Sequence, residues 1–77
     1  MTAEAAILAL LEERAPGRTI CPTEAAKALA GAGGDWRARM REVHESVDSL
    51  LEEGAITLSW KGKPLGQRRG AYRIARR

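Results

Sequence analysis

The sequence predicts a single α+β domain over residues 1–77, in which three helices come before a small antiparallel sheet. A chain of 77 residues is long enough for one domain with one core. Apolar residues recur at helical spacing through the first two thirds of the chain, most clearly between Trp36 and Leu51. After Gly54 apolar and polar residues alternate, which is typical of half-buried strands.

We expect the first helix to run from about Thr2 to Arg14. The Thr2 hydroxyl can cap its N-terminus, and the breaker pair beginning at Pro16 ends it. One side of this helix carries an apolar stripe formed by Ile7, Leu8, Leu10 and Leu11.

A second, shorter helix is expected to follow a short extended segment that ends at Ile20. Cys21 takes the N-cap position and Pro22 the first helical position, where a missing backbone N–H costs no hydrogen bond. Glu24 can accept a hydrogen bond from the Cys21 amide, which is half of a capping box. Gly31 ends the helix.

The third helix is expected to run from an Asp35 cap to Glu53, with Gly54 as its stop. Its apolar residues form one stripe at spacings of three or four, closed by an adjacent pair: Trp36, Met40, Val43, Val47, Leu50 and Leu51.

The C-terminal third predicts two strands. Residues 56–60 alternate apolar with polar side chains, and the alternation returns at Tyr72 and Ile74. Residues 61–69 contain two glycines and a proline, so we expect a long turn between the strands. Trp36 and Trp60 lie on the apolar sides of their elements, which favours core anchoring over stacking on bases.

This order of elements (helix, short strand, two helices, strand, turn, strand) is that of a winged helix-turn-helix domain. The turn and its flanking strands form the hairpin called the wing. Because this hairpin contains Lys61, Lys63, Arg68 and Arg69, the expected wing is basic.

Four segments of the chain carry a family resemblance: Ile20-Cys21-Pro22-Thr23-Glu24-Ala25-Ala26, Asp35-Trp36-Arg37, Lys61-Gly62-Lys63-Pro64 and Arg69-Gly70. With these segments, nearly the whole chain resembles a family of short bacterial proteins catalogued as a domain of unknown function. The family block reads Ile-Cys-Pro-Ser/Thr-Glu-Ala-Ala. The resemblance implies a winged-helix fold and brings no activity, substrate or site. Family members often carry Pro at the position of Arg41, which implies that residues 36–40 form a separate turn before the third helix proper.

Cys21 is the only cysteine, so the chain has no internal disulfide. A secreted domain of this size would normally need disulfides, so we expect a reducing, cytoplasmic location. The first apolar run is too short to span a bilayer and is interrupted by Glu12, and no basic segment precedes it. The sequence therefore predicts no membrane partner.

The charges are divided unevenly along the chain. Residues 1–53 contain six basic and all ten acidic side chains, whereas residues 54–77 contain seven basic side chains and no acid. This division favours a polyanionic partner for the C-terminal third. In winged-helix proteins the third helix enters the major groove and the wing contacts phosphates or the minor groove. The expected nucleic-acid contacts are Arg37, Arg41, Lys61, Lys63, Arg68, Arg69 and Arg73.

The third helix argues against sequence-specific readout. Opposite its apolar stripe it presents carboxylates at Glu42, Glu45 and Glu52, with Asp48 beside them, and these repel phosphates. We therefore expect a regulatory or accessory protein that contacts DNA or RNA mainly through the wing. The alternative is a protein-interaction module, or a homodimer, whose acidic helix face and basic wing engage a protein partner.

Cys21 supports a third hypothesis, that of a thiol sensor. A thiol at a helix N-terminus lies in positive potential, which favours the reactive thiolate. The competing interpretation is a helix-capping residue, since no second cysteine could resolve a sulfenic acid. His44, the only histidine, could approach Cys21 in this fold, but no third residue is evident to orient such a pair. We expect no catalysis, no metal site and no cofactor.

Overall fold

The structure is a computed structural model that describes residues 1–77. Its helices are α1 (Ala3–Glu12), α2 (Pro22–Ala30), the 3₁₀ turn η1 (Arg37–Arg39) and α3 (Met40–Glu52); its strands are β1 (Ile56–Trp60), β2 (Lys63–Leu65) and β3 (Arg73–Arg76). The strands form an antiparallel sheet in the order β2-β1-β3. An antiparallel bridge between Ile20 and Ile74 adds a fourth segment at the free edge of β3. The predicted α+β fold is confirmed, and the order of elements is consistent with a winged helix.

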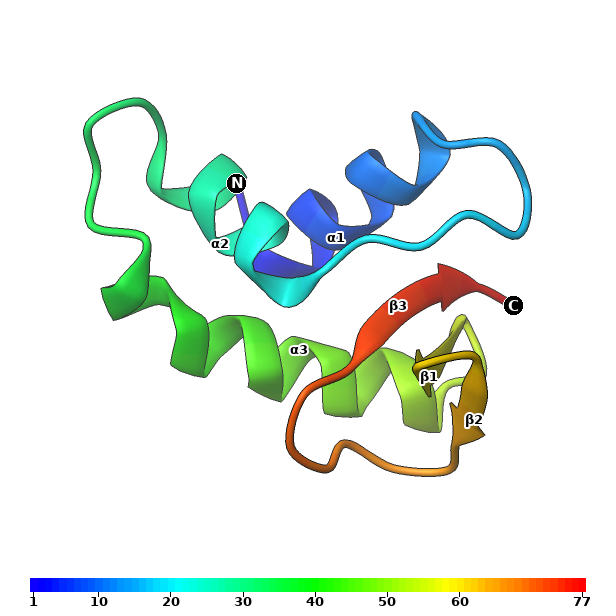
Figure 1. The fold of residues 1–77 in the computed structure, drawn as a ribbon. Coiled ribbons are helices and arrows are strands. Elements are labelled where there is room, and N and C mark those ends of the chain that lie inside the picture. Colours follow the sequence, from blue (N-terminus) through cyan, green and yellow to red (C-terminus); the bar gives the residue numbers. More distant parts are fainter.

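α3 runs along the molecule, with α2 on the side of its N-terminal half and the sheet beside its C-terminal half (Figure 1). α1 and α2 pack on each other and both contact α3, while β1 to β3 gather beside the C-terminal half of α3. No helix combines the length and the apolar character needed to cross a membrane.

The N-terminal caps predicted for the first two helices form. The Thr2 hydroxyl accepts a hydrogen bond from the Ala5 amide at 3.1 Å. The Cys21 amide donates to the Glu24 carboxylate at 2.8 Å, with Pro22 at the start of α2. The same carboxylate accepts a hydrogen bond from the Arg14 guanidinium at 2.8 Å, so Glu24 also ties the end of α1 to the start of α2.

The expectation of one continuous helix from Asp35 to Glu53 is wrong. Residues 37–39 form the separate turn η1, as the family resemblance implied, and α3 begins at Met40. Asp35 Oδ1 accepts a long hydrogen bond of 3.4 Å from the Ala38 amide and caps this turn instead of α3. All three residues of η1 are exposed, so no buried side chain holds them in register with the apolar stripe of α3.

The expectation of a long turn over residues 61–69 is also wrong. Lys61 and Gly62 have φ values of 52° and 80°, the left-handed conformation that a two-residue hairpin turn requires. The chain then returns as β2, with Lys63 opposite Trp60 and Leu65 opposite Leu58. β2 is an edge strand, which is where a proline such as Pro64 is tolerated.

The core consists of apolar residues from every long element: Ala3, Ile7, Leu11, Ile20, Ala25, Ala26, Val43, Val47, Leu50, Ile56, Leu58, Tyr72 and Ile74. Trp36 is half-buried and packs against its edge. Trp60 does not anchor the core, in contrast to the prediction, because 40% of its surface is exposed. It lies two residues after Leu58, the last buried residue of β1, and so on the same face as Ile56 and Leu58.

We predict that Ile20→Ala lowers the free energy of unfolding by about 2–5 kcal/mol, the usual cost of truncating a buried isoleucine. Ile20 is fully buried and joins the sheet to the helices. Leu8→Ala is the matched control, because Leu8 is 41% exposed on α1 and should change stability little. Urea denaturation measures both, and equal losses would contradict the central position of Ile20.

Candidate functional site

Three of the predicted phosphate contacts are exposed and free of acidic partners. Lys61 lies in the turn between β1 and β2, Lys63 begins β2, and Arg69 lies in the loop of residues 66–72 before β3. None of the three belongs to any of the four salt bridges of the protein. Their charges therefore face solvent without local neutralisation.

Arg68 differs from its neighbour because it is bound to α3. Its Nε and Nη2 atoms donate to the two carboxylate oxygens of Asp48, each at 3.0 Å. The hydrogen bond from Arg68 holds the pKa of Asp48 below its ordinary value of 3.8. This ion pair neutralises the charge of Arg68 within the protein and attaches the loop of residues 66–72 to α3.

Arg73 is fixed by hydrogen bonds to uncharged groups, so its positive charge is not neutralised within the protein. Its Nε donates to Thr19 Oγ1 at 2.8 Å and its Nη2 to the Thr19 carbonyl at 3.3 Å, so both partners are neutral. The guanidinium is half-buried and fixed in position at the start of β3. Such a group presents a preoriented positive charge.

The remaining two predicted contacts lie in η1 and in the first turn of α3, away from the hairpin. The Arg37 guanidinium lies 4.3 Å from the centre of the Trp36 ring. Arg41 makes a loose pair with Glu45 at 3.8 Å, and both side chains are largely exposed. The predicted set is therefore divided between the sheet end and the α2–α3 end of the molecule (Figure 1).

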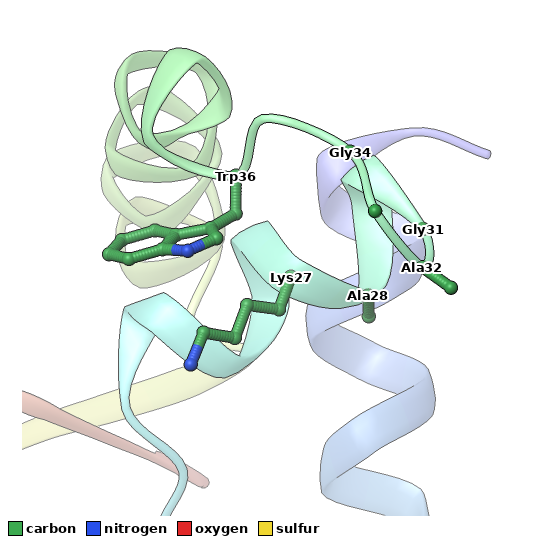
Figure 2. A pocket seen from close by; sticks show the side chains of 7 residues that line it. Lys27, Ala28, Gly31, Ala32, Gly34 and Trp36 are labelled. Carbon is green, nitrogen blue, oxygen red and sulfur yellow. The ribbon is translucent and has the colours of Figure 1, made fainter.

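An open pocket of about 450 Å³ lies beside the loop that connects α2 to η1. Lys27 and Trp36 lie at one side of it and the backbone of residues 31–34 at the other, as Figure 2 shows. The Lys27 ammonium is 5.3 Å from the centre of the Trp36 ring. With Arg37 also over the ring, the aromatic surface of Trp36 is engaged by the protein's own cations.

A second pocket, of about 340 Å³, lies where the start of α2, the side of α3 and the sheet meet. It is lined by Cys21, Pro22, Thr23, His44, Trp60, Gly70, Ala71, Tyr72 and Arg73, and we call it the Trp60 pocket. No carboxylate lines it, whereas acidic side chains line all three pockets along α3 and its C-terminus.

Two residues that line the Trp60 pocket, Tyr72 and His44, are joined by a hydrogen bond. The Tyr72 hydroxyl lies 2.6 Å from His44 Nδ1, and the two rings are tilted by 56°. Burial lowers the pKa of His44 below 6.5, with a smaller contribution from the Arg68 charge. Burial also raises the pKa of Tyr72 to about 12. Both directions fit a neutral Tyr72 hydroxyl that donates a hydrogen bond to Nδ1 of a neutral His44.

Cys21 and His44 thus share a pocket, a proximity that the sequence left open. The imidazole Nδ1 is engaged by Tyr72, and the half-buried Cys21 is the N-cap of α2. Sequence reasoning missed Tyr72, Asp48 and the exposed position of Trp60. His44 and Asp48 are four residues apart, so they lie on one side of α3, and this spacing could have indicated a shared contact.

We predict that His44 titrates below 6.5 and that Arg68→Ala raises its midpoint, since a nearby cation is removed and Asp48 is freed. Arg69→Ala is the control and should leave the midpoint unchanged. NMR of the single histidine measures both. The pKa of His44 is higher in the unfolded state than in the folded state. Protonation of His44 therefore lowers the free energy of unfolding as the pH falls from about 6.5 towards the folded-state pKa. A titration midpoint of His44 above 6.5 in the wild-type protein would contradict the buried environment described for this side chain.

Comparison with curated proteins finds no match to this chain. Comparison with protein families gives one that covers residues 1–77, described as "Protein of unknown function (DUF3253)". Since the match spans the whole chain, the protein belongs to this family of unknown function.

Proposed function

We propose that the protein is a cytoplasmic winged-helix protein that binds DNA or RNA, in a regulatory or accessory role and not as an enzyme. Phosphates are contacted by the basic hairpin surface, which we define as Lys61, Lys63, Arg69 and Arg73. One observation carries this proposal. Among the seven cations of residues 54–77, only Arg68 forms a salt bridge, and no acid lies in that segment.

The surface of α3 supports binding through the hairpin rather than through this helix. Glu45 and Glu52 are exposed on it, and phosphates approaching that face would be repelled. The loop of residues 66–72 is also fastened to α3 through Asp48 and His44. Because the acidic face of α3 disfavours its entry into a major groove, the proposed binding is mainly independent of base sequence.

We predict that the double variant Lys63→Ala/Arg69→Ala weakens binding to duplex DNA, single-stranded DNA and tRNA alike. Each lost phosphate contact lowers the slope of log affinity against log salt by about 0.7–0.9, so the double variant should lose about 1.4–1.8. Fluorescence anisotropy between about 50 and 200 mM salt measures both affinity and slope.

The matched control is Arg39→Ala/Arg41→Ala, which removes the same net charge from the other end of the molecule. Arg39 and Arg41 pair with Glu42 and Glu45, so this variant should retain most of the affinity. Equal losses in the two double variants would contradict a hairpin contact. Failure of the wild-type protein to retain any of these nucleic acids at low salt would contradict the proposed function itself.

A second candidate is association between copies of the chain. The exposed carboxylates Glu45, Glu52 and Glu53 complement the exposed cations of the basic hairpin surface. Association of this kind predicts a sedimentation coefficient that rises with protein concentration and falls back in high salt. A concentration-independent monomer in analytical ultracentrifugation at low salt would exclude it.

A further inference from the structure

We infer that the Trp60 pocket receives an unpaired base, so that the protein binds single-stranded nucleic acid in preference to duplex. This inference rests on the proposed function and specifies its substrate class. It is carried by the exposed indole of Trp60, by the composition of the pocket around it and by the cations on either side.

Trp60 offers a stacking surface that the protein itself does not use. Its side chain is 40% exposed, and no aromatic or cationic group of the chain stacks on its ring. Trp36 provides the contrast, because Arg37 and Lys27 already lie over its ring. Stacking on an exposed aromatic ring is the usual way in which proteins hold single-stranded bases without reading their sequence.

The pocket around Trp60 has the size and chemistry for a small planar group. Its volume of about 340 Å³ lies at the lower end of the range for small-molecule pockets. Pro22, Ala71 and Tyr72 provide apolar walls, while Cys21, Thr23 and His44 provide polar groups for the edge of a base. Because no carboxylate lines the pocket, it does not repel a nucleotide.

Cations flank the pocket on both sides. Lys61 follows Trp60 directly and Lys63 is its partner in the β1–β2 register, so both charges lie at the tryptophan end. Arg73 lines the pocket from the other strand, held by Thr19, and Arg69 precedes Gly70 at the pocket wall. A strand whose base enters the pocket therefore has positive charges next to the phosphates before and after that base.

A base paired within a duplex is stacked on its neighbours and cannot also stack on Trp60. The pocket is thus selective for unpaired bases, whereas the cations alone would bind any polyanion. This difference separates the contribution of Trp60 from that of the basic hairpin surface.

The test uses the full chain carrying Trp36→Phe, in which Trp60 is the only tryptophan. A dT oligonucleotide of about ten nucleotides, a longer GC-rich DNA duplex that stays paired at low salt, heparin and thymidine monophosphate are titrated at low salt. We expect the oligonucleotide to quench Trp60 fluorescence and the duplex and heparin to leave it nearly unchanged. The mononucleotide, which lacks neighbouring phosphates, should bind at least tenfold more weakly than the oligonucleotide.

The complementary variant is Trp60→Ala in the wild-type background, with Trp36→Phe as its control. Stacking predicts a loss of roughly tenfold or more in affinity for the oligonucleotide, and little change for duplex or heparin. Thermal unfolding should show that the variant remains folded, since Trp60 lies outside the core.

The outcomes distinguish this inference from the proposed function. If none of the polyanions binds, the proposed function fails and the inference with it. If all bind but Trp60 is not quenched, or Trp60→Ala weakens duplex and single strand equally, phosphate binding stands and the base pocket is wrong. Equal affinity for the mononucleotide and the oligonucleotide would also overturn the single-strand assignment.

Discussion

The bridge between Ile20 and Ile74 joins the helical half of the molecule to the sheet, and the arrangement of the Trp60 pocket depends on it. The two residues exchange reciprocal backbone hydrogen bonds of 2.8 Å, and both side chains are fully buried. Residues adjacent to a paired strand position are also brought together. Cys21 therefore lies near Arg73, and Thr19 meets the Arg73 guanidinium. The bridge at Ile20 thus fixes the start of α2 against β3, and residues from both line the Trp60 pocket.

The loop of residues 66–72 is attached to α3 by two contacts of unequal strength. The Arg68–Asp48 pair is exposed, and such pairs contribute between 0 and about 1 kcal/mol. Tyr72 is 3% exposed, and burial of an aromatic side chain is worth about 1.5–3 kcal/mol. The position of the loop therefore depends mainly on Tyr72, while the ion pair sets the direction in which Arg68 points. Arg69, the adjacent residue, is left free because only Arg68 is within reach of a carboxylate.

Much of the fold could be predicted from local signals in the sequence. Thr2, Glu24 and Pro22 act over one helical turn, and the alternation of residues 56–60 is equally local. Two of the errors concern where elements begin. The stripe from Trp36 to Met40 has helical spacing, but spacing does not show that residues 37–39 bury nothing. The Lys61-Gly62 turn was hidden by Pro64 and Gly66, which follow it, although a glycine after an alternating strand is a hairpin signal.

The candidate site was less accessible to sequence reasoning because its contacts are remote in the chain. Charge counting identified the cations but could not separate Arg68 from Arg69, since that difference depends on Asp48, twenty residues away. The same holds for the two tryptophans, which look alike in an apolar pattern. Trp36 is covered by Lys27 and Arg37, whereas Trp60 extends past the core beside uncovered cations. Exposing a large aromatic surface opposes folding by the hydrophobic effect, and a base stacked on the indole would remove that surface from water.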